Sequence, residues 1–106
     1  MKLDTKTELD RYVSHISTIE GVSQVYLFGS HAYGVPDDGS DIDLLVVIDD
    51  SLDVVKIAFT IQKGLANRVI PLDVLVNRIS EFNNASEGTT LQSHIQKEGV
   101  LLYERQ

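Results

Sequence analysis

The chain has 106 residues, of which 42% are hydrophobic and 24% are charged, as is usual for a globular protein. We expect residues 1–106 to form one domain around a single hydrophobic core. The formal net charge of −7 argues against direct electrostatic binding to nucleic acid, and it implies that phosphate groups would need metal ions to approach. Cysteine is absent, which excludes disulfides and thiolate metal sites, and no apolar run approaches the ~18 residues of a membrane span. We therefore expect a cytoplasmic protein without a membrane partner.

The first half of the chain predicts one helix and two strands. Apolar side chains recur at the i, i+3, i+4, i+7 spacing of an amphipathic helix, which Gly21 would end. The second strand follows a segment dense in glycine, proline and aspartate, the residues typical of turns. The elements expected here are a helix over 3–21, a strand over 22–28, a turn-rich segment over 31–40 and a strand over 40–49.

The second half continues the alternation of helices and strands. The elements expected here are a helix over 52–67, a strand over 69–77, an irregular segment or short helical turn over 78–89, a helix over 90–99 and a last short strand over 100–104. This order indicates an α/β (α+β) fold with a small mixed central sheet and helices packed against it, on one face.

Two carboxylates interrupt the apolar strand at 40–49. Side chains alternate along a strand, so Asp41 and Asp43 are expected on one face, roughly 6 to 7 Å apart, while Ile42 and Leu44 enter the core. Ionised carboxylates repel each other, and burial makes each harder to ionise, so cations are needed to compensate them. Mg²⁺ prefers a few carboxylates together with substrate phosphates, and this pair is suited to holding one or two such ions.

A third acid lies in the strand at 69–77. Asp73 is flanked by Leu72 and Val74, so it too is a charge within an apolar strand. If this strand neighbours the one with Asp41 and Asp43, the three carboxylates can form one cluster. An aspartate beside a bound ion can also accept a proton from an attacking hydroxyl group.

A Gly-Ser pair ends the strand at 22–28. Gly29 would let a ligand approach the backbone closely. Ser30 is expected at the start of a short helix, where free backbone N–H groups favour a phosphate and the hydroxyl adds a further hydrogen bond.

Each of these residues also has an ordinary structural interpretation. Asp41 alone is explained equally well as an acid at a strand or turn boundary, Gly29-Ser30 as a common turn, and Asp73 as a strand charge facing solvent. Asp43 is harder to explain in this way. The functional interpretation depends on the presence of all five residues together: Gly29, Ser30, Asp41, Asp43 and Asp73. Several other polar residues are expected to be structural or solvated: His15, Asp37, Asp38, Asp49, Asp50, Arg68, Arg78 and His94.

Gly29-Ser30, ten residues and then Asp41-Ile42-Asp43 match the GSx10DxD signature, and the chain resembles the DNA polymerase β-like nucleotidyltransferase superfamily. The short length and the stretch "LFGSHAYG…SDIDLLV" are similar to its minimal nucleotidyltransferase (MNT) branch. The resemblance covers nearly the whole chain and implies the polymerase β-like fold.

The resemblance also assigns roles to the five residues. It implies that Gly29 and Ser30 position the nucleotide triphosphate and that Asp41 and Asp43 bind two Mg²⁺ ions. Asp73 would share the catalytic ion and help activate the acceptor hydroxyl. The implied reaction transfers a nucleoside monophosphate, AMP from ATP, and releases pyrophosphate.

Many minimal members pair with HEPN-domain proteins, and some are antitoxins that adenylylate the HEPN toxin, so the resemblance implies such a partner. The sequence departs from the family after Gly29-Ser30, where members often carry a basic residue and this chain has His31 and Tyr33. Two alternatives stay open: a non-catalytic antitoxin that binds its toxin stoichiometrically, and transfer to a small-molecule hydroxyl with help from a partner subunit. The nucleotide base, the acceptor and homo- or hetero-oligomerisation are open as well.

Overall fold

The structure is a computed structural model, and it describes residues 3–33, 41–84 and 90–105. The helices and strands follow one another in the order that the sequence predicts: the short helix expected from Ser30 is present, and a short helix stands in the segment expected to be irregular or a helical turn. The elements are α1 (Leu3–Ser17), β1 (Val22–Phe28), α2 (Ser30–Tyr33), β2 (Ile42–Ile48), α3 (Val54–Gly64), β3 (Leu72–Arg78), α4 (Ile79–Asn84), α5 (Leu91–Glu98) and β4 (Val100–Glu104).

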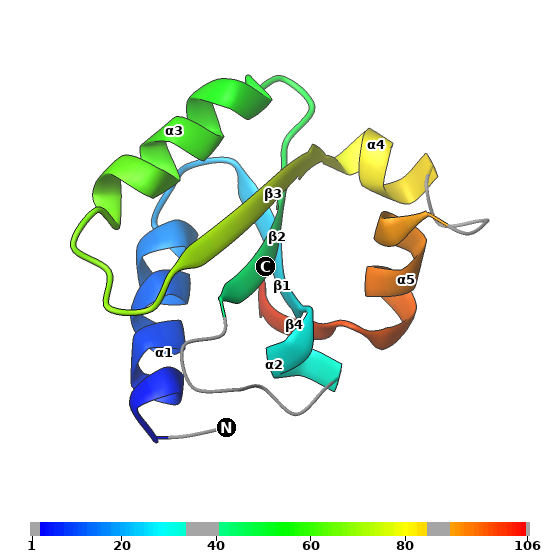
Figure 1. Cartoon of the computed structure of the whole chain (residues 1–106). Coiled ribbons are helices and arrows are strands. Elements are labelled where there is room, and N and C mark those ends of the chain that lie inside the picture. The colour runs from blue at the N-terminus through cyan, green and yellow to red at the C-terminus, as the bar shows by residue number, and fades with distance from the viewer. Residues whose placement is uncertain (1–2, 34–40, 85–89, 106) are drawn as a thin grey trace.

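Four strands form one mixed sheet in the order β3-β2-β1-β4 (Figure 1). β1 pairs antiparallel with both β2 and β4, whereas β2 and β3 run parallel. A parallel pair needs a crossover connection, and α3 supplies it. β2 and β1 are therefore the inner strands, and β3 and β4 are the two edges.

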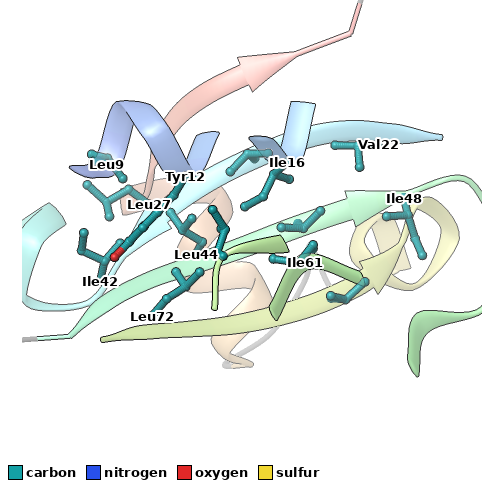
Figure 2. Packing of buried hydrophobic residues seen from close by; sticks show 14 residues of the cluster. Leu9, Tyr12, Ile16, Val22, Leu27, Ile42, Leu44, Ile48, Ile61 and Leu72 are labelled. Atoms are coloured by element: carbon teal, nitrogen blue, oxygen red, sulfur yellow. The ribbon is translucent and has the colours of Figure 1, made fainter. Parts of the chain in front are cut away.

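The main core lies between the sheet and the two longest helices, α1 and α3. Leu9, Tyr12 and Ile16 follow one another on the inner face of α1 at helical spacing and are at most 5% exposed. Figure 2 shows these side chains above the apolar residues of β1, β2 and β3. The cluster also contains Leu27 from β1, Ile42, Leu44, Val46 and Ile48 from β2, Leu72 and Val76 from β3, and Ile61 and Leu65 at the end of the α3 segment.

A smaller core covers the opposite face of the sheet. Phe82 of α4 and Ile95 of α5 pack there against Leu45 and Val47 of β2. The expectation that all helices pack on one face is therefore wrong: α1 and α3 lie on one side of the sheet, and α4 and α5 lie on the other (Figure 1). The physical reason is that β2 is apolar on both faces, so each face needs a cover.

Element boundaries differ from the predicted ones mainly around β2 and β3. β2 begins at Ile42, so Asp41 lies directly before the strand rather than within it. β3 begins at Leu72 rather than at residue 69. None of the helices within the described ranges is long and apolar enough to cross a membrane.

Candidate active site

The Gly-Ser pair lies where β1 ends and α2 begins. Gly29 has a φ of 77°, a left-handed conformation that residues other than glycine rarely adopt. Its carbonyl accepts a hydrogen bond from the backbone N–H of Ala32, 3.0 Å away, which closes the first turn after the strand. The prediction that Ser30 stands at the start of a short helix is confirmed, since it is the first residue of the four-residue α2.

The backbone of Gly29 lies against the carboxylate of Asp43. A Cβ atom built on Gly29 would overlap Oδ2 of Asp43 and lie 3.0 Å from its Cγ. Phe28, the neighbour of Gly29, is the pairing partner of Asp43 in the β1–β2 ladder. Position 29 thus needs glycine for its backbone conformation and also for the space that the carboxylate occupies.

Asp43 and Asp73 are directly paired in the parallel register of β2 and β3. Each is the second residue of its strand, so the two acids lie at the same end of the sheet. Because side chains alternate, Asp43 shares its face with Leu45, on the side covered by α4 and α5, and Asp73 shares the same face with Leu75. The expectation that the two acidic strands are neighbours is confirmed.

The two paired acids differ in exposure. Asp43 is half-buried, whereas Asp73 is exposed on an edge strand. Asp41 is exposed as well, two residues before Asp43. One carboxylate is therefore held inside the site, and the other two stand where a ligand from solvent can reach them.

The pKa of Asp43 is raised above its ordinary value. Burial is the largest cause, followed by the negative charges of Asp73 and then of Asp41, while the nearby His31 of α2 lowers it. The charges of Asp73 and Asp41 therefore both act on Asp43. A cation between these carboxylates would offset both the repulsion and the loss of hydration.

The donor set is that of a site for a hard divalent cation. Carboxylate oxygens are the protein ligands that Mg²⁺ prefers, and it takes few of them because it keeps waters and substrate phosphates as further ligands. Over residues 3–33, 41–84 and 90–105, no three His, Asp or Glu side chains are placed so that they alone could hold an ion.

Four of the other polar residues singled out in the sequence have partners away from this site. Arg78 Nε donates to the carbonyl of Leu52, and Arg68 Nη1 donates to the carbonyl of Leu65. Asp49 forms an ion pair with Arg105, at 2.8 Å. Asp50 accepts a hydrogen bond from the backbone N–H of Ser80, and Asp37 and Asp38 lie outside the described residues.

Sequence reasoning missed one polar cluster, at Glu8 on α1. This carboxylate is 7% exposed, accepts hydrogen bonds from Arg11 and from the backbone of Val69, and lies 2.9 Å from the Tyr12 hydroxyl. The sequence contains one indication of this cluster: Glu8 stands four residues before Tyr12, a spacing at which two helix side chains can form a hydrogen bond. The contact with Val69, 61 residues away, has no local signal.

The sequence matches the family model described as polymerase beta, nucleotidyltransferase, over residues 11–106. No curated protein matches the chain. The matched range includes β1, β2 and β3 as well as the Gly-Ser pair and the three acids.

Solved structures share the fold at low sequence identity. A protein of Sulfolobus solfataricus assigned as a nucleotidyltransferase is 24% identical, with a TM-score of 0.65 over 93% of this chain and 79% of that one. A chain from a toxin–antitoxin complex with AMP-PNP is 23% identical, with a TM-score of 0.57 over 94% of this chain and 73% of that one. A chain from the toxin–antitoxin pair MntA-HepT is 20% identical, with a TM-score of 0.56 over 94% of this chain and 73% of that one.

Proposed function

Since this chain belongs to the polymerase β nucleotidyltransferase family, we propose that it transfers AMP from ATP to a hydroxyl group of a partner protein, with Mg²⁺. The observation that carries the proposal is the pairing of Asp43 with Asp73 beside the backbone of Gly29. It brings carboxylates for cations and a close backbone approach for phosphate to one end of the sheet. The cytoplasm supplies the ATP that the reaction consumes.

Each residue of the site has a proposed task. Asp41 and Asp43 hold Mg²⁺ with oxygens of the triphosphate, and Asp73 shares the ion from the neighbouring strand. When bound, two such ions would neutralise the triphosphate and stabilise charge on the attacking and leaving oxygens. Gly29 and Ser30 bind the phosphates through the backbone, which Gly29 leaves accessible because it has no side chain, and through the Ser30 hydroxyl.

The reaction is an in-line displacement at the α-phosphorus. The acceptor oxygen forms a bond to this phosphorus, and the bond between the phosphorus and the oxygen bridging to the β-phosphate breaks. Pyrophosphate leaves with that oxygen, and Asp73 accepts the proton of the acceptor hydroxyl, a task for which its exposure suits it.

We propose a HEPN-domain toxin as the protein partner, with this chain as its antitoxin. Support comes from the resemblance of the sequence to minimal nucleotidyltransferases and from the shared fold with chains of toxin–antitoxin pairs. The acid end of the sheet carries two exposed carboxylates, Asp41 and Asp73, so an acceptor group can approach from outside.

Label transfer from ATP tests the proposal. The purified chain is incubated with Mg²⁺ and the product of the neighbouring gene, once with ATP labelled at the α-phosphate and once with ATP labelled at the γ-phosphate. Only the α-label should appear on the partner, and Asp43→Asn should lower the rate by about 100-fold or more. The matched control is Asp10→Asn, which removes an exposed acid on α1 and should leave the rate unchanged.

Two outcomes would overturn the proposal. Equal transfer by the wild type and by Asp43→Asn would show that the acids are not catalytic. Neutralisation of the toxin by Asp41→Ala and Asp43→Ala as effectively as by the wild type would establish stoichiometric binding instead.

A further inference from the structure

The segment before β3 is held by two side chains of α1. Glu8 Oε2 accepts a hydrogen bond from the backbone N–H of Val69, at 2.6 Å. The Tyr12 hydroxyl donates to the carbonyl of Ile70, at 2.5 Å, and accepts from the N–H of Ile70, at 3.2 Å. We call these two side chains, Glu8 and Tyr12, the brace.

The brace is itself firmly held. Arg11 Nε and Nη2 donate to the two oxygens of Glu8, at 2.8 Å and 3.0 Å, and the Tyr12 hydroxyl lies 2.9 Å from Glu8 Oε2. Tyr12 is fully buried, and its ring packs in the main core. These hydrogen bonds, that from Arg11 first, lower the pKa of Glu8 to about 2, against the opposing effect of burial, so the carboxylate is charged at neutral pH.

Within the described residues, the braced segment has one further anchor, the side chain of Ile70, which is partly buried against the main core. The side chain of Val69 is 82% exposed and contributes no packing, and the neighbouring Arg68 and Pro71 are exposed as well. Pro71 has no N–H to donate. The backbone of Val69 is therefore located by its hydrogen bond to Glu8, and that of Ile70 by its hydrogen bonds to Tyr12 together with the packing of its own side chain.

This segment leads directly into β3, which begins at Leu72. Among the described strands, β3 is an edge strand that pairs with β2 alone, and their pairing begins at Ile42 with Leu72. Directly before it, Ile42 donates its N–H to the carbonyl of Pro71, at 2.9 Å. Asp73 follows Leu72, only three residues after Ile70. In Figure 2 the hydroxyl end of Tyr12 points toward Ile42 and Leu72, the first residues of the two acidic strands.

A buried carboxylate and a buried hydroxyl often add no more to the free energy of unfolding than apolar side chains of the same volume. The carboxylate of Glu8 is buried while its partner Arg11 is 38% exposed, and removing a charge from water costs free energy that the ion pair has to offset. Directed hydrogen bonds, in contrast, fix a backbone at one position, and a shift of one residue would turn Asp73 to the opposite face of the sheet. Hydrogen bonds from the brace therefore fix the position of the backbone before β3 better than apolar packing would.

We propose that Glu8 and Tyr12 are positioning residues for nucleotidyl transfer, which fix the start of β3 and so keep Asp73 opposite Asp43. The proposal rests on the proposed function for its catalytic consequence. The brace lies on the α1 face of the sheet, while the acids project from the opposite face, so it acts through the backbone and without contact to the substrate.

Tyr12→Phe is the sharpest variant, because it keeps the buried ring and removes only the hydroxyl. Glu8→Gln, which keeps the side-chain shape, serves as the second variant. The matched control is Arg78→Met, which removes a side-chain hydrogen bond to the carbonyl of Leu52 at the far end of the same strand. All three are compared with the wild type at matched fractions of folded protein.

Amide hydrogen exchange and kinetics give independent readouts. For Tyr12→Phe we expect exchange of the Ile42 amide to rise by about tenfold or more, with little change at the far end of β2. We expect kcat for nucleotidyl transfer to fall by about tenfold while KM for ATP stays within about twofold, because Asp73 acts on the acceptor hydroxyl. Arg78→Met should lower thermal stability without either effect.

The two readouts test the positioning role of Glu8 and Tyr12 and the proposed function separately. Unchanged exchange of the Ile42 amide in both brace variants would overturn the inference, and so would a loss of kcat no larger than that of Arg78→Met at equal stability. If the wild type transfers no nucleotide, the proposed function fails. In that case the exchange rate of the Ile42 amide in the brace variants still shows whether the brace fixes the start of β3.

Discussion

Asp43 and Asp73 are direct partners on parallel strands, each one residue inside the beginning of its strand. Parallel strands lie about 4.8 Å apart, so two like charges are placed side by side with no basic side chain between them in the strand pairing. The pKa of Asp43 is raised by its burial and by this neighbour. The metal-free protein is therefore expected to have its acids in an unfavourable arrangement, which a ligand relieves.

Asp43→Asn should raise the free energy of unfolding of the metal-free protein. Without divalent ions, the variant should unfold at a higher urea concentration than the wild type, by roughly 0.2–1 kcal/mol, because the substitution removes one of two facing like charges. With excess Mg²⁺ and nucleotide the order should reverse, since binding to the folded wild type adds stability. A variant less stable than the wild type in the absence of metal would mean that Asp43 is a structural residue.

Gly29→Ala should damage both the fold and the site. Alanine at a φ of 77° costs about 1–2 kcal/mol, and its Cβ would have to displace the carboxylate of Asp43. We expect transfer activity to be lost even in the fraction that remains folded. The measurements are urea unfolding and activity per folded molecule.

Gly21→Ala is the matched control for that variant. Gly21 also has a positive φ, 94°, but its added Cβ would meet the flexible end of the Leu52 side chain. A similar loss of stability with full activity per folded molecule is expected. Equal loss of activity in both variants would trace the effect to backbone strain in general and not to the carboxylate of Asp43.

The parts of the site that local chemistry specifies could be predicted from the sequence. The strand at 22–28 is confirmed at both ends, because its β-rich run stops at Gly29, and Ser30 begins a helix as expected. The proximity of Asp43 and Asp73 also followed from the pattern, since an isolated charge in each of two apolar strands is explained when the strands are neighbours. The first two features depend on residues within a few positions of one another, and the third on the same local signal in two strands.

The parts that depend on long-range contacts could not be predicted. Glu8 reads as an ordinary helix charge until the backbone of Val69, 61 residues away, is placed against it. The start of β3 was expected at residue 69 because Val69 and Ile70 are apolar and β-branched. Their backbone groups bond instead to α1, so the strand begins at Leu72.

The pH dependence of stability should report the charge of Glu8. Its pKa falls from 4.5 to about 2 on folding, so the folded state favours the ionised form. Its contribution is complete above about pH 4.5 and is lost as the pH falls toward 2. We expect wild type and Glu8→Gln to differ by on the order of 2 kcal/mol at pH 7 and by much less near about pH 3, in urea unfolding at each pH.

Asp10→Asn is the control on the same helix. Asp10 pairs with Lys6 at 3.4 Å, but both side chains are about two-thirds exposed, so this ion pair should contribute a few tenths of a kcal/mol at most. A stability difference between wild type and Glu8→Gln that stays constant from pH 7 to about pH 3 would contradict the assignment of the effect to the Glu8 charge.

Asp53→Ala should destabilise the fold without affecting the site. The Asp53 carboxylate caps α3 by accepting hydrogen bonds from the backbone N–H groups of Val55, at 2.9 Å, and Lys56, at 3.2 Å. Losing this cap costs about 1 kcal/mol, whereas Asp53→Asn keeps a capping oxygen and should cost only a few tenths. Because α3 begins after the end of β2 while the acids stand at its beginning, activity per folded molecule should be the same in both variants. If Asp53→Ala lowered that activity while Asp53→Asn did not, the start of α3 would have to communicate with the acids through β3, against which α3 packs.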